Sequence, residues 1–168
     1  MPKPLTVSTP SDREIVIARD FDAPRELVFL CYSKPELLRR WYGLPDWMMT
    51  VCEIDFRVGG KWRFVTRAPS GYEMGSSGIY REIFSPERIV NSETYDQDWT
   101  GGETLVTLRL TETDGRTTAT TTVLYASKEA RDGAAASPMA TGMEIGFKRL
   151  DEVLATEARD QKSTLPPR

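Results

Sequence analysis

The chain has 168 residues, of which 39% are hydrophobic and 28% charged, values typical of a single globular domain. Its net charge of −3 argues against a nucleic-acid partner and against attraction to an anionic membrane. No apolar run approaches the roughly 20 residues that span a bilayer, so we expect no membrane insertion. The N-terminus carries no apolar signal segment, and we expect a cytoplasmic protein.

Histidine is absent from the sequence. This excludes histidine-dependent catalytic triads and proton shuttles and most zinc and iron sites, so we expect neither a metal nor a cofactor. The two cysteines, Cys31 and Cys52, form no CxxC pair and cannot make a structural zinc site by themselves. Two reduced, partly buried thiols are the favoured interpretation, and a disulfide between them is the alternative.

A strand and two short helices are predicted first. Apolar residues alternate over residues 15–21, which is typical of a strand. Asp22 can cap a helix that opens at Pro24, where a missing N–H costs little. The stretch from Ser33 to Glu36 has the form of a capping box and predicts a second helix that Gly43 ends.

Six strands are expected next, over residues 51–56, 61–67, 72–84, 88–95, 103–111 and 117–125. Short turns join them, among them a hairpin at Asp114-Gly115, so the strands should form an antiparallel meander. Gly75 and Gly78 interrupt the third of these strands and predict a bulge or bend there.

A long amphipathic helix is predicted at the end of the chain, from Pro138 to about residue 156, with Ser137 as its cap. Gly142 and Gly146 indicate a close approach of the helix backbone to a neighbour. Asp151 falls off the apolar stripe and is expected at the surface. The stripe itself repeats at spacings of three and four and comprises Met139, Met143, Phe147, Leu150 and Leu154.

The predicted order is therefore one strand, two short helices, six strands, a short helix over residues 127–135 and the long helix. The apolar face of the meander needs a cover, and the long helix is the only element of matching size. This is an α+β fold with one domain over residues 13–157. Residues 1–12 and 158–168 are expected to be flexible tails.

Several motifs, in order along residues 13–156, resemble a bacterial family similar to the C-terminal domain of the activator of Hsp90 ATPase. That family belongs to the START-like (SRPBCC) helix-grip superfamily. The resemblance implies a curved antiparallel sheet that grips the long helix, with a cavity between them. The motifs are FDAPRELV at 21–28, PELLRRWYG at 35–43, RVGGKWRF at 57–64, GIYREI at 78–83, PERIV at 86–90, GME at 142–144 and LDEVL at 150–154.

The superfamily includes lipid and polyketide carriers, cyclases and co-chaperone domains, so the fold alone does not choose a function. We expect a small hydrophobic or aromatic ligand, lipid- or polyketide-like, in the cavity. One alternative is a chaperone partner and a protein-interaction role like that of the Hsp90 activator, which an exposed apolar patch would favour. Another is a cyclase or hydrolase, which a buried acid with a raised pKa would favour. A homodimer is left open.

The candidate ligand-binding residues share an expected position on the inner face of the sheet, on the long helix or near the cavity mouth. For the apolar ones, simple core packing is the alternative interpretation. No catalytic residue is identified. The candidates are Trp41, Trp47, Trp62, Phe64, Met74, Tyr80, Glu93, Tyr95, Thr121, Met139, Met143 and Phe147.

Glu93 is the unusual member of this set. If Ile89 faces the core, the two-residue period of a strand places Glu93 and Tyr95 on the same face. An unpaired buried carboxylate is costly, so Glu93 should have a cationic partner or bind something. Arg63 and Arg81 are the candidate partners, and a solvent-facing Glu93 is the alternative.

Overall fold

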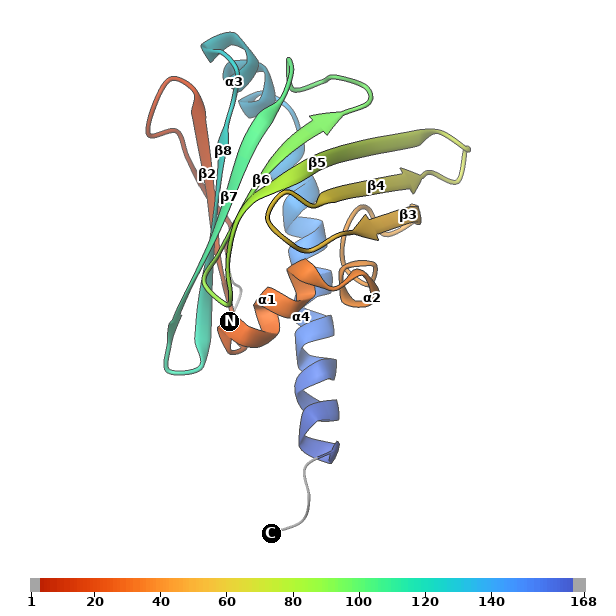
Figure 1. Ribbon diagram of the computed structural model, residues 1–168, viewed down its shortest axis with the longest axis vertical. Helices are drawn as coiled ribbons and strands as arrows, with labels where there is room; N and C mark the ends of the chain where they lie inside the picture. Colours follow the sequence, from red (N-terminus) through yellow and green to blue (C-terminus); the bar gives the residue numbers. More distant parts are fainter. Residues whose placement is uncertain (1–3, 165–168) are drawn as a thin grey trace.

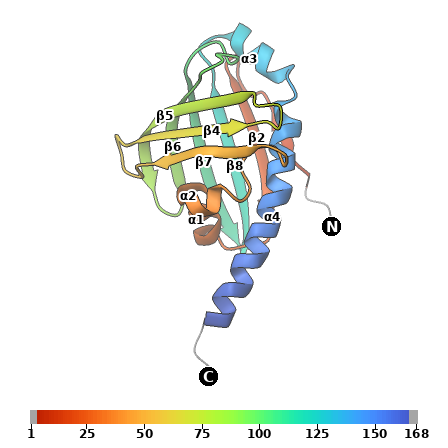
Figure 2. The same ribbon diagram turned by 90° about the vertical axis from the view of Figure 1, so that its right-hand side faces the viewer.

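The computed structural model describes residues 4–164. An antiparallel sheet curves around one long helix, as Figures 1 and 2 show. The strands lie side by side in the order β1-β2-β8-β7-β6-β5-β4-β3. They are β1 (Thr6–Ser8), β2 (Glu14–Phe21), β3 (Met48–Ile54), β4 (Lys61–Arg67), β5 (Glu73–Phe84), β6 (Arg88–Tyr95), β7 (Thr104–Thr113) and β8 (Arg116–Leu124).

Four helices complete the described part of the chain: α1 (Arg25–Ser33), α2 (Pro35–Leu38), α3 (Lys128–Ala135) and α4 (Met139–Thr164). The long helix α4 crosses the concave side of the sheet, and its C-terminal turns extend beyond the sheet (Figures 1 and 2). Helix α3 lies at the end of the sheet opposite α1 and α2 (Figure 1). The α+β helix-grip prediction is confirmed. None of the helices within residues 4–164 is both long and apolar enough to cross a bilayer.

Both ends of the chain hold more regular structure than the sequence predicted. Strand β1 lies within residues 1–12, expected to be a tail, and pairs with β2 so that Thr6 lies opposite Ala18. It pairs there because β2 would otherwise leave a free edge of backbone N–H and C=O groups. Helix α4 continues to Thr164 and does not end near residue 156. Residues 157–164 contain no glycine or proline that would end it.

The helix caps predicted for α1 and α2 do not form. The N-cap of α1 makes no side-chain hydrogen bond, so Asp22 is not its cap. Instead, the Arg25 backbone N–H donates to Glu112 of the β7–β8 hairpin at 2.7 Å. The hydroxyl of Ser33 donates to the carbonyl of Phe29 at 2.9 Å and closes no capping box. At the N-terminus of α1, the hydrogen bond that a neighbouring side chain was expected to accept is therefore accepted by the carboxylate of Glu112, from a distant part of the chain.

The glycines of β5 permit close contacts and do not mark the bulge that they predicted. The register shift between β5 and β6 comes after Tyr80. A Cβ on Gly75 would lie 2.2 Å from a carboxylate oxygen of Asp96, and one on Gly78 would lie 1.8 Å from the carbonyl oxygen of Ser92. Any side chain at these positions would clash with β6 or the residue that follows it.

An ion pair ties the first long strand to α4. Both terminal guanidinium nitrogens of Arg19 donate to the two carboxylate oxygens of Asp151, each at 2.7 Å. The side chain of Arg19 is 3% exposed and that of Asp151 30%. Asp151, predicted at the surface, is therefore partly exposed, and the sequence did not indicate its buried partner. Alternation along β2 puts Arg19 on the core face between Ile17 and Phe21, and its guanidinium lies 4.8 Å from the centre of the Phe21 ring.

Both cysteines are free and buried, which confirms the favoured interpretation over a disulfide. Burial raises the pKa of the Cys31 thiol to about 12 and also raises the pKa of Cys52. The thiol form is therefore dominant near neutral pH, and both side chains act as small apolar core residues.

Candidate functional site

The inner face of β6 carries a carboxylate toward the interior. Ile89 is 4% exposed and belongs to the core, and it lies opposite Leu108 of β7. Glu93 and Tyr95 follow Ile89 on β6 by four and six residues, so they share its parity and lie on the same face of the strand. Tyr95 lies opposite Ser76 of β5. The structure therefore has the strand register that the prediction of an inward-facing Glu93 required.

Three other elements bring hydroxyl groups to this carboxylate. Tyr42 follows α2, Ser76 lies on β5 and Tyr125 follows β8. Tyr95 makes a side-chain hydrogen bond with Glu93, and Tyr42 makes hydrogen bonds with Ser76 and with Tyr95. The Tyr125 hydroxyl donates to the sulfur of Met139 on α4 at 3.5 Å. We call the residues that surround the carboxylate the Glu93 cluster, which comprises Tyr42, Ser76, Glu93, Tyr95 and Tyr125.

The number of protons fixes the direction of these hydrogen bonds when Glu93 is ionised. A carboxylate only accepts, so Tyr95 donates to Glu93. Each hydroxyl has one proton, so Tyr42 must then donate to Tyr95, and Ser76 to Tyr42. With Tyr125 donating to Met139 on α4, every hydroxyl proton of the cluster is engaged by a group of the protein.

Burial dominates the electrostatics of this cluster. Desolvation raises the pKa of Glu93 from its ordinary 4.5 to about 7, and the hydrogen bond from Tyr95 opposes the rise only in part. Burial first and the Glu93 charge second raise the pKa of Tyr125 to about 12 and that of Tyr42 higher still. Among the described residues, no arginine or lysine acts on the pKa of Glu93.

The two arginines proposed as partners of Glu93 lie elsewhere. Arg63 makes a bidentate ion pair with Asp96, with nitrogen-to-oxygen distances of 2.8 and 2.7 Å. It pairs across the sheet with Glu53 and Ser77, positions that alternate with the inward-facing ones. Arg81 is exposed. The prediction of Arg63 or Arg81 as the partner is wrong because strand parity turns Arg63 to the outer face.

The middle of α4 is buried in the core, whereas residues of its first turns pack against the core and stay partly exposed. Phe147 and Leu150 are 4% and 0% exposed, whereas Met139 and Met143 are only partly buried. The side chains of Tyr42, Glu93 and Tyr95 also keep exposed surface, although the fold desolvates them strongly. Gly142 is partly buried, and a Cβ there would meet no atom within 4 Å, whereas one on Gly146 would lie 3.4 Å from the Trp41 carbonyl.

The candidate residues from the sequence divide into two groups. Those that are buried are Trp41, Trp62, Phe64, Tyr80 and Phe147, which belong to the hydrophobic core, and Thr121. Those that keep exposed surface are Trp47, Met74, Glu93, Tyr95, Met139 and Met143. Trp47 lies outside the Glu93 cluster, and its ring contacts that of Tyr72 at 6.2 Å.

Sequence reasoning omitted Ser76 and Tyr125 from the candidate site. Both could have been found from strand alternation, because Ser76 is opposite Phe64 of β4 and Tyr125 extends the inward series of β8 that includes Thr121 and Val123. Tyr42, which follows the candidate Trp41 in the sequence, was not among the candidates either. What alternation does not show is that the three hydroxyls meet at one carboxylate.

Two surface depressions of the described residues lie away from this cluster. One, with a volume of about 470 Å³, is on the outer face of β3 to β6 and is lined by residues that include Glu53, Lys61 and Thr94. The cavity between the sheet and α4 therefore stays a prediction. Across the described residues, no three cysteine, aspartate or glutamate side chains gather as potential metal ligands.

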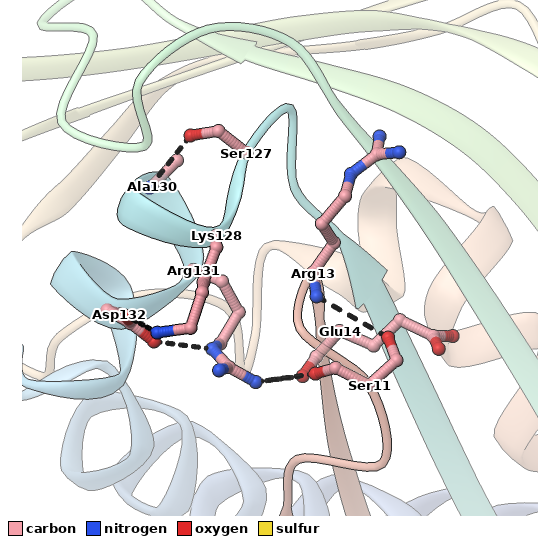
Figure 3. A network of polar contacts seen from close by, with 8 residues as sticks. All are labelled: Ser11, Arg13, Glu14, Ser127, Lys128, Ala130, Arg131 and Asp132. Atoms are coloured by element: carbon pink, nitrogen blue, oxygen red, sulfur yellow. Dashed lines mark hydrogen bonds and ion pairs between the residues drawn. The ribbon is translucent and has the colours of Figure 1, made fainter.

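Hydrogen bonds hold helix α3 against the segment that leads into β2 (Figure 3). Arg131 donates to the carbonyl of Ser11 at 2.6 Å and to the carboxylate of Asp132 at 2.9 Å. Ser127 caps the helix by accepting from the Ala130 N–H at 3.1 Å. Arg13 donates to the Tyr125 carbonyl at 2.8 Å. These bonds fix the backbone that presents the Tyr125 hydroxyl.

A curved antiparallel sheet around a long C-terminal helix, with a polar cluster enclosed between them, defines a START-like helix-grip domain. The chain belongs to the Activator of Hsp90 ATPase homolog 1-like family, whose model matches residues 22–155. No curated protein matches the sequence.

Solved structures agree with this assignment. A protein from Rhodobacter sphaeroides is 38% identical, with a TM-score of 0.86 over 91% of this chain and 99% of that one. Proteins from Nitrosomonas europaea (20% identical, TM-score 0.79, 90% and 99% of the two chains) and Arthrobacter aurescens (24%, 0.78, 90% and 91%) share the fold. None of the three is described by a ligand, partner or reaction, so the function has to be argued from the site.

Proposed function

We propose that the protein binds a small hydrophobic or aromatic molecule between the sheet and the first turns of α4, with the polar end of that molecule at the Glu93 cluster. The observation that carries this proposal is the partial exposure of Met139, Met143, Glu93 and Tyr95, whereas Phe147 and Leu150 farther along α4 are buried. Apolar residues that stay partly exposed beside a few polar groups are suited to contact a small ligand.

The chemistry of the surrounding side chains supports an apolar body for the ligand. Met139 and Met143 on α4 and Met74 on β5 are partly buried thioethers. Methionine side chains are flexible and polarizable, so they adapt to apolar ligands of varied shape. Polar groups are confined to the Glu93 cluster and would fix the orientation of the ligand.

Filling the region with a larger side chain should abolish binding. We expect the parent protein to bind the neutral dye N-phenylnaphthylamine with a saturable rise in fluorescence. Met143→Trp should weaken binding by about tenfold or more, because the indole occupies the dye's space. Glu152→Trp, which adds the same ring at an exposed position of α4, is the matched control and should bind like the parent. A folded Met143→Trp variant that binds equally well would contradict the proposal.

A second candidate function is proton-transfer catalysis on a bound carbonyl compound. The specific observation is the pKa of Glu93, raised by burial to about 7, since an acid or base works best when its pKa is near the working pH.

This candidate predicts hydrogen exchange at carbon. In D2O, the parent protein should speed deuterium incorporation into the methyl group of acetonaphthone above the buffer rate, as followed by mass spectrometry. Glu93→Gln should return the rate to that of buffer, because an amide cannot take the proton. Equal rates for parent and buffer while the ketone binds would leave binding as the function and remove catalysis of this kind.

A further inference from the structure

We propose that the polar end of the ligand is a protonated amine, received by the Glu93 carboxylate and carried by an apolar or aromatic body. This inference rests on the proposed function and names its ligand class. It follows from three independent features of the Glu93 cluster: its surplus of hydrogen-bond acceptors, its lack of an internal cation and its aromatic surroundings.

The first feature is the balance of donors and acceptors. All four hydroxyl protons of the cluster are engaged by groups of the protein: three in the chain from Ser76 through Tyr42 and Tyr95 to Glu93, and one in the bond from Tyr125 to Met139 on α4. What is left unsatisfied is acceptor capacity on the carboxylate and on the Tyr125 oxygen. An ammonium group has three donors and no acceptor, so it complements this arrangement, whereas a carboxylate ligand would add only more acceptors.

The second feature is the uncompensated charge. The described residues place no arginine or lysine on Glu93, since Arg63 is paired with Asp96 on the outer face. A cation from the ligand would supply the missing partner and would hold Glu93 ionised. The groups coupled to Glu93 are the phenols of Tyr95 on the same strand and of Tyr42 and Tyr125 from other parts of the chain, and burial keeps all three uncharged at neutral pH.

The third feature is the aromatic surroundings. The ring of Tyr42 lies 5.2 Å from that of Phe64, and the ring of Tyr95 lies 5.0 Å from that of Trp99. Aromatic faces carry negative electrostatic potential and attract ammonium groups, most strongly where water is excluded.

The experiment compares three probes that share one aromatic body: naphthylethylamine, naphthylethanol and naphthylacetate. Calorimetric titration at pH 8 keeps Glu93 ionised and the amine protonated. The parent protein should bind the amine at least about tenfold more tightly than the alcohol, and the acetate most weakly, as expected for a hydrogen bond between charged groups. Lowering the pH to 6 should weaken binding of the amine selectively, because Glu93 takes up a proton.

The variant Glu93→Gln should bind the alcohol within about twofold of the parent and lose the preference for the amine. Glu103→Gln, which removes an exposed carboxylate, is the control and should keep that preference. If the alcohol or the acetate binds at least as well as the amine, the amine proposal is wrong and the binding function stands. If none of the three binds, both are wrong. A preference for the amine that survives in Glu93→Gln would also overturn the assignment to Glu93.

Discussion

Asp151→Asn should lower the free energy of unfolding by about 3 kcal/mol, the lower end of the range for removing one partner of a buried ion pair. The substitution keeps the size of the side chain and leaves the guanidinium of Arg19, whose side chain is 3% exposed, without its countercharge. The guanidinium lies against Phe21 and Phe147 and cannot turn toward water without opening the core. Urea unfolding followed by tryptophan fluorescence measures the loss.

The opposite substitution should cost less. Arg19→Met keeps an apolar stem in the core, and the carboxylate of Asp151 can be hydrated because its side chain is 30% exposed. We expect a loss of about 1 kcal/mol, since replacing a buried ionic group by a well-packed apolar one is often nearly neutral. Equal losses for Arg19→Met and Asp151→Asn would show that burial of the cation is not what makes the pair sensitive.

The ion pair between Arg63 and Asp96 provides a control with the same geometry and a different environment. Its two hydrogen bonds are 2.8 and 2.7 Å long, close to those of the buried pair, but its side chains are 37% and 45% exposed. Asp96→Asn should therefore cost less than about 1 kcal/mol, because water screens the pair and solvates what is left. A loss as large as that of Asp151→Asn would contradict the role given to burial.

The sequence predicts the sheet well because each strand is specified by local patterns. Residues 61–67 and 88–95 were predicted as strands and are β4 and β6 to the residue. The hairpin at Asp114-Gly115 forms with both residues at positive φ, 53° and 76°, as a two-residue hairpin turn of this composition requires. Alternation on β6 also placed Glu93 on the inner face.

What the sequence did not predict depends on contacts between distant segments. Arg19 and Asp151 are 132 residues apart, and Asp151 lies beside the apolar stripe of α4, where a carboxylate is ordinarily solvated. The cap of α1 comes from Glu112, which is 87 residues away from the amide that it accepts. Local patterns give the face of a residue and do not identify which polar group from another element it will meet.

The candidate site divides in the same way. Inward parity for Glu93 and Tyr95 follows from β6 alone. The proximity of Tyr42 and Tyr125 to Glu93 cannot be predicted from β6, because Tyr42 follows helix α2 and Tyr125 follows strand β8. The division of the aromatic candidates into core and partly exposed residues also depends on how closely α4 approaches the sheet, which side-chain volumes decide together.

Glu93→Gln should make the protein more stable at pH 8 and leave its stability unchanged near pH 4.5. Folding raises the pKa of this carboxyl from 4.5 to about 7, so between these values the folded state holds a proton that the unfolded state has released. The free energy of unfolding of the parent must therefore fall as the pH rises from about 4.5 to 7 and then level off, with a total loss of at most about 3 kcal/mol. The glutamine variant carries no such proton and escapes this loss.

Urea unfolding of parent and variant across pH 4.5 to 8 measures the difference directly. The stabilisation by Glu93→Gln should grow through the window between 4.5 and about 7 and be constant above it. The exposed control Glu103→Gln should give a curve parallel to that of the parent, because the same change of charge occurs there without burial. If the difference in free energy of unfolding between Glu93→Gln and the parent does not vary with pH, the carboxyl is solvated in the folded state. Glu93 would then not be a buried group of the site. Combined with loss of the preference for the amine in the same variant, a pH-dependent gain would identify Glu93 as a group that is kept for binding at the expense of stability.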